Sequence, residues 1–169
     1  WYSAYTGGET YHEAGSSLLN YVMDGGHLLM NAPELKDSTF TWFPIKSTSV
    51  INPSGRLFQG TILESEISDS LDLALSQLVA IRVKGFEPDS SEFSSIKSLY
   101  NMEEGDGSDE WTDSPNVCSL GRFQVSPTVE SGKVVLFSIP MHNGSAPVLE
   151  GGISAKGFID YLLNEEFAE

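Results

Sequence analysis

The residues of this sequence best suited to chemistry follow two apolar segments, residues 27–30 and 134–139. An imidazole can donate, accept or coordinate, a carboxylate can exchange a proton, and an indole ring can stack on a sugar. Because open α/β sheets bind ligands at the carboxyl ends of their strands, we expect residues 31–43 to form the floor of any site. The candidate ligand-binding residues are Asn31, Glu34, Trp42, His142 and Asn143.

Simpler structural explanations exist for the same side chains. His142, Asn143 and Gly144 spell a turn in which Asn and Gly accept positive φ angles, and we prefer this interpretation. Trp42 lies among phenylalanines, so we favour a core anchor over a platform for sugars. The sequence demands no pair of catalytic carboxylates, and its DGSD and SGK strings lack the glycine spacing and the following Lys-Ser/Thr of a phosphate-binding loop. We therefore expect no cofactor.

The densest group of carboxylates is EEGDGSDEWTD, residues 103–113. Its oxygen-bearing side chains alternate with glycines, as in loops that bind calcium. The full calcium pattern is missing, because no glycine stands at the expected turn and no distal bidentate glutamate follows. We prefer a solvated acidic loop. The calcium candidates are Glu104, Asp106, Ser108 and Asp109.

Composition limits the class of protein. A chain of 169 residues with 40% hydrophobic residues suits a single domain, residues 1–169. Nine Lys and Arg against 24 Asp and Glu give a net charge of −15, which repels nucleic acid and anionic membranes. No apolar run approaches the length of about 20 residues that crosses a bilayer, so we expect no membrane insertion. Cys118 stands alone and cannot form an internal disulfide.

One stretch predicts a helix, a tight turn and a buried strand. Thr10 and Glu13 form a capping box that starts the helix. Gly25 and Gly26 end it, because glycine reaches the left-handed conformation of a helix C-cap without a steric clash. Residues 27–30 then form a buried strand. The apolar stripe of the helix consists of Ala14, Leu18, Tyr21 and Val22.

The later segments complete an α/β domain. Residues 45–80 predict short strands and turns, and residues 87–116 a long surface excursion with one short helix or packed turn near residues 93–100. The run at 134–139 predicts a second buried strand beside 27–30, and a last helix from about Ser154 frays into an acidic tail. We predict a mostly parallel central sheet flanked by helices, with an inserted region of short strands and a long acidic loop.

Three segments resemble glutamine-amidotransferase-like domains of flavodoxin-type architecture: YVMDGGHLLMNAP, GTILESEISDSLDLAL and SGKVVLFSIPMHNG. They look most like the catalytically silent versions found as modules of large secreted or surface proteins in bacteria. The resemblance implies a flavodoxin-like sheet, a secreted or cell-surface location, and one or more βα elements before Trp1. We therefore expect the chain to be a fragment of a longer protein.

An active amidotransferase of this class needs a thiolate on a strained turn after a central strand, and a His and Glu after the last core strand. Here Asn31, Ala32 and Pro33 follow the strand at 27–30, so the nucleophile is missing. His142 stands where the family has its base, but Asn143 and Gly144 follow it in place of an acid. The neighbours of Cys118 form no recognisable elbow.

Two functions follow. The first is a non-catalytic module that binds or braces neighbouring domains of the same protein, or binds an unknown small ligand. The second is a hydrolase that acts on a carbohydrate or peptide at the carboxyl ends of the strands, where Glu34 and His142 would converge with Asn31 and Trp42.

Overall fold

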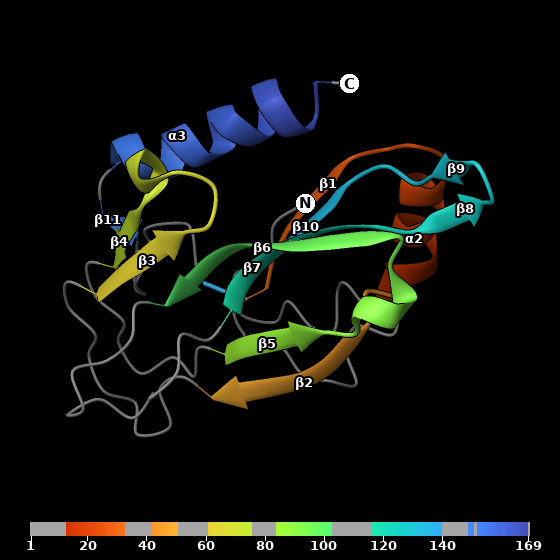
Figure 1. Ribbon diagram of the computed structural model, residues 1–169, viewed down its shortest axis with the longest axis horizontal. Coiled ribbons are helices and arrows are strands. Elements are labelled where there is room, and N and C mark those ends of the chain that lie inside the picture. Colours follow the sequence, from red (N-terminus) through yellow and green to blue (C-terminus); the bar gives the residue numbers. More distant parts are fainter. Residues whose placement is uncertain are drawn as a thin grey trace.

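The computed structural model describes seven parts of the chain: residues 13–32, 42–50, 61–75, 84–102, 116–139, 149–150 and 152–168. Within them a seven-stranded sheet lies between two layers (Figure 1). Helix α3 (Gly152–Tyr161) crosses one face, and the opposite face packs on helix α2 (Gly15–Met23) and on a two-stranded sheet of β2 (Ile45–Val50) and β5 (Lys84–Pro88).

The central sheet has the strand order β1-β10-β7-β6-β3-β4-β11. Its strands are β1 (Leu28–Asn31), β3 (Thr61–Ser65), β4 (Leu73–Leu75), β6 (Ser95–Met102), β7 (Asn116–Arg122), β10 (Val134–Phe137) and β11 (Leu149–Glu150). Of the six neighbouring pairs, β1–β10 is parallel and the other five are antiparallel. The described sheet is therefore mixed, with one parallel pair.

The parallel pair is the one that the sequence predicts, and Leu28 lies opposite Val134 at its start. The prediction of a mostly parallel sheet is wrong for the strands described. A parallel connection needs a crossover of a dozen or more residues, which is usually a helix. Among the described residues between Trp42 and Ile139, the only helical structure is two 3₁₀ turns, η1 (Asp69–Leu71) and η2 (Ser90–Glu92). Neither turn is long enough to form such a crossover.

Strand β6 lies in the middle of the sheet, where the sequence predicts a surface excursion with a short helix or packed turn. That prediction is wrong for residues 95–102. Ser98 pairs with Ser119 and Tyr100 with Cys118, so Leu99 is an extra residue in a β-bulge. Because of this extra residue, the apolar side chains of β6 do not alternate strictly. Leu99 and Tyr100 follow Ile96 by three and four residues, and this spacing imitates a helix. Residues 103–115, with the predicted acidic loop, lie outside the described residues.

Helix α2 ends as predicted. The Gly25 N–H donates to the Val22 carbonyl and the Gly26 N–H to the Tyr21 carbonyl, each at 2.9 Å. These two bonds make a Schellman motif, which requires a left-handed residue at its centre. Gly25 supplies it with φ +94°. Thr10, the predicted N-terminal cap, lies outside the described residues.

The predicted apolar stripe of α2 is correct in part. Val22 is fully buried and Leu18 partly buried against the core. Tyr21 is 54% exposed, so its assignment to the buried stripe is wrong. Its ring lies against Gly26, at a place where a Cβ atom would overlap it. The tyrosine therefore covers the turn after the helix, a position that spacing along the helix does not reveal.

Every side chain of β10 is buried, as predicted for a core strand. Val134 and Leu136 face the layer that contains α2, and Val135 and Phe137 face α3. On the α3 side the rings of Tyr100, Phe137 and Phe158 contact one another with centroids 5.0–5.9 Å apart. Helix α3 continues into a π-helical turn, η3 (Leu162–Glu166). The predicted last helix is therefore present, and its last turn packs on the sheet.

Gly132 lies against the turn that ends α2. Its N–H donates to the Val22 carbonyl at 2.9 Å, and a Cβ atom at this position would overlap the backbone oxygen of Gly26. Only glycine therefore allows the chain to enter β10 at this distance from the helix end. This approach aligns β1 with β10.

We expect Gly132→Ala to lower the free energy of unfolding by about 3 kcal/mol, because backbone atoms must separate to admit the methyl group. The matched control is Gly157→Ala in α3, where the new Cβ would meet only Leu71 Cδ2 at 3.7 Å. This control should raise stability by about 0.5–1 kcal/mol, since alanine favours a helix over glycine. Urea denaturation measures both, and equal effects of the two substitutions would contradict the packing described for Gly132.

Candidate functional site

Asn31 closes the carboxyl end of the parallel strand pair. Its side chain is 1% exposed, and Nδ2 donates to the carbonyls of Phe137 at 2.9 Å and Ile139 at 2.5 Å. The Ala32 N–H donates to the same Phe137 carbonyl at 2.9 Å. At the position where an amidotransferase would carry its nucleophile, the chain thus carries an amide that joins the ends of β1 and β10.

Trp42 lies in the core, at 6% exposure. Its indole packs on α2 so closely that a Cβ atom at Gly15 would lie 2.8 Å from Cδ1. The ring meets Phe43 edge-on, with centroids 6.5 Å apart. This is the arrangement of a core anchor. The other predicted site residues lie outside the described residues: Glu34, Glu104, Asp106, Ser108, Asp109, His142 and Asn143.

Cys118 is fully buried in β7. Burial raises the pKa of its thiol well above the ordinary value, because a thiolate loses its hydration inside the core. The sulfur therefore stays protonated and out of contact with solvent in the folded chain. These are the properties of a structural cysteine rather than a nucleophile.

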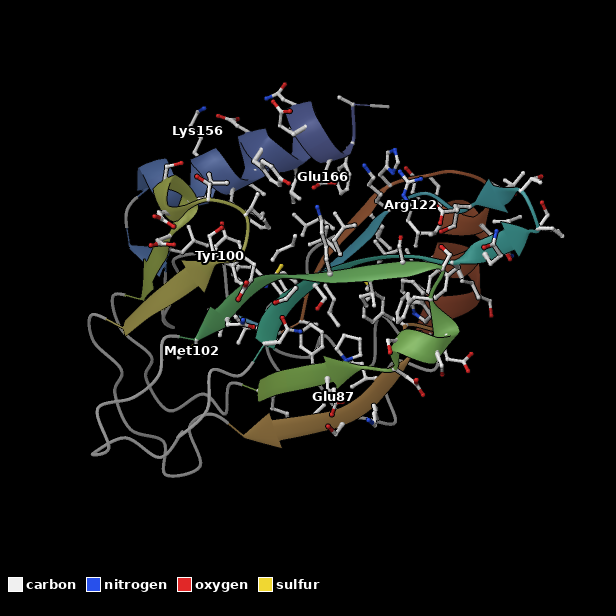
Figure 2. All side chains as sticks on the ribbon, viewed as in Figure 1. Glu87, Tyr100, Met102, Arg122, Lys156 and Glu166 are labelled. Carbon is white, nitrogen blue, oxygen red and sulfur yellow. The ribbon has the colours of Figure 1, made fainter. Side chains whose placement is uncertain are left out.

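A charged hollow of about 380 Å³ lies at the other end of the parallel pair. Its walls come from β6, β7, η3, the start of β10 and the hairpin of β8 (Gln124–Ser126) and β9 (Val129–Glu130). Figure 2 shows Glu166 and Arg122 on the α3 side of the sheet. The lining residues are Ser95, Ile96, Lys97, Leu120, Arg122, Glu130, Lys133 and Glu166.

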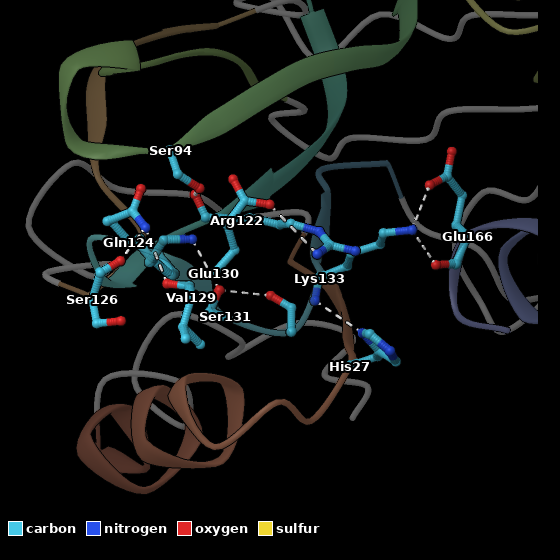
Figure 3. Close-up of polar contacts among 12 residues, drawn as sticks. His27, Ser94, Arg122, Gln124, Ser126, Val129, Glu130, Ser131, Lys133 and Glu166 are labelled. Carbon is cyan, nitrogen blue, oxygen red and sulfur yellow. Dashed lines mark hydrogen bonds and ion pairs between the residues drawn. The ribbon is translucent and has the colours of Figure 1, made fainter. Parts of the chain in front are cut away.

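Glu166 is held by two lysines, Lys97 of β6 and Lys133, which directly precedes β10. Its carboxylate lies 2.5 Å from Lys97 Nζ and accepts a hydrogen bond from the Tyr161 hydroxyl. It also lies 3.3 Å from Lys133 Nζ (Figure 3). The side chains of Glu166 and Lys133 are only 11% and 9% exposed. The predicted fraying of the helix into an acidic tail is therefore wrong at this residue.

The environment of Glu166 favours its charged form. Burial by itself raises the pKa of the carboxyl group, but hydrogen bonds from Lys97 and Tyr161, the charge of Lys97 and a hydrogen bond from Lys133 outweigh it. The pKa falls from an ordinary value of 4.5 to about 2. Tyr161 responds in the opposite direction, because burial and its bond to the Glu166 carboxylate raise the pKa of its hydroxyl.

His27 and Phe167 fix the end of the chain beside this ion pair. The ring of Phe167 stacks on the imidazole with centroids 5.0 Å apart and planes 5° apart. Nδ1 of His27 accepts a hydrogen bond from the Lys133 N–H at 2.9 Å, as Figure 3 shows. The residues after α3 are thus attached to the starts of both β1 and β10.

A second ion pair borders the hollow. Arg122 and Glu130 approach to 3.6 Å, which is beyond hydrogen-bonding distance, and the Glu130 side chain is 42% exposed. The hairpin that carries Glu130 is held by Gln124, whose Nε2 donates to the Val129 carbonyl at 3.0 Å. Ser131 Oγ accepts from the Phe123 N–H at 2.9 Å and fixes the base of the hairpin.

Sequence reasoning missed this hollow because its charges come from distant segments. One signal was present: Lys133 stands directly before the most apolar strand, where a buried cation needs a partner. The sequence does not indicate which of 24 acidic residues that partner is.

The described residues also lack two other features. They contain no group of three His, Cys, Asp or Glu side chains that could hold a metal ion. None of the helices in the described parts is long and apolar enough to cross a membrane.

The Glu166 ion pair makes the free energy of unfolding depend on pH. Unfolded Glu166 takes up a proton near pH 4.5, whereas the folded chain keeps the carboxylate charged down to about pH 2. The pair therefore contributes fully above pH 4.5, and its contribution is lost as the pH falls toward 2. We expect Glu166→Gln to lower the free energy of unfolding at pH 7 by about 2 kcal/mol, and to flatten its decline below pH 4.5.

The matched control is Glu165→Gln, because Glu165 is its exposed neighbour on the same turn. It should change stability by less than about 0.5 kcal/mol. Urea denaturation from pH 2 to pH 7 measures all three proteins. Equal pH profiles for the parent chain and Glu166→Gln would contradict the lowered pKa.

Cys118 offers a direct chemical test of its burial. We expect iodoacetamide to leave the thiol unmodified in the native chain at pH 8 and to alkylate it fully in urea, because the reagent needs an exposed thiolate. Mass spectrometry counts the adducts. Rapid labelling of the native chain that is lost in Cys118→Ala would instead identify an accessible, reactive thiol.

Comparison with known proteins gives one distant likeness to report. No protein-family model matches the sequence, and no curated protein matches it significantly. The solved structure of the GH42 beta-galactosidase Gan42B is similar over 92% of this chain, with 10% sequence identity and a TM-score of 0.43. The match covers 20% of that enzyme, so this chain spans about a fifth of its length. A likeness at this level says nothing of what this chain binds or does.

Proposed function

We propose that this chain is a non-catalytic α/β module that binds or braces neighbouring domains of a longer protein. The single observation that carries this proposal is Asn31 at the end of β1, where the resemblance to amidotransferases would require a reactive thiol. The Asn31 amide donates to two backbone carbonyls, of Phe137 and Ile139. A group used in this way joins two strands and attacks no substrate.

Cys118 supports the same proposal. It is the single cysteine of the chain, so thiol chemistry would have to use it. Full burial and a raised pKa oppose this role, since nucleophilic catalysis needs an exposed thiol that ionises easily and a base within hydrogen-bonding reach.

The proposal also includes a secreted or cell-surface location and partners among the neighbouring domains of the same protein. Both come from the resemblance to amidotransferase-like modules.

The proposal predicts no hydrolysis. We expect the native protein to release no product above buffer from glutamine, from a nitrophenyl acetate ester or from nitrophenyl galactosides, because none of the residues described at the ends of β1 and β10 is an activated nucleophile. Chromogenic and coupled ammonia assays measure this for the longest soluble form of the protein.

The variants His142→Ala, Glu34→Gln and Cys118→Ala make the assay decisive. Turnover that disappears in His142→Ala and Glu34→Gln would overturn the proposal in favour of the hydrolase predicted from the loops. Turnover that disappears only in Cys118→Ala would overturn it in favour of a thiol enzyme. Turnover that survives in all three variants and co-purifies with the chain would also overturn it, because other residues would then carry the activity.

A further inference from the structure

We draw no further inference here: the strongest candidate, the surface formed by the exposed apolar side chains of α2 and of the β8–β9 hairpin (Tyr21, Val125 and Val129), carries none, because nothing in the structure shows what covers it.

Discussion

The structure depends on one constraint, which is that β10 must be covered on both faces. All four of its side chains are completely buried, two toward each face of the sheet. Exposure of either pair would leave large aliphatic or aromatic groups in water, at about 25 cal/mol for each Å² of apolar surface. The three layers follow from this requirement: α3 covers Val135 and Phe137, while α2 and the β2–β5 sheet cover the other face.

The two ends of the parallel pair of β1 and β10 explain the polar contacts described here. At the carboxyl end, backbone carbonyls need partners where the sheet stops, and the Asn31 amide supplies them. At the other end, Lys133 enters the buried region with its charge, and that charge needs a counterion. Glu166 reaches it only because α3 crosses the sheet and its last turn comes down beside the start of β10. The charged hollow is a consequence of the same layering that buries the core.

Much of the scaffold could be predicted from local pattern. The Gly25-Gly26 helix end and the pairing of β1 with β10 could be predicted, because a Schellman turn and a fully apolar strand each depend on a few adjacent residues. The direction of the other strands and the central position of β6 in the sheet could not be predicted. A single bulge at Leu99 shifts an alternating pattern into helical spacing, and whether a strand pairs parallel or antiparallel depends on partners far away in the sequence.

By itself, the sequence determined that the chain has a core of apolar strands, an acidic surface and no thiol directly after residues 27–30, because composition and residue identity need no partner. Tertiary structure alone decided that Lys97, Lys133 and Glu166 meet, that Cys118 is inaccessible and that Trp42 packs on Gly15. These contacts join residues up to 69 positions apart, as in the Lys97–Glu166 pair. Their physical origin is the packing of whole layers, which no local pattern of residues encodes.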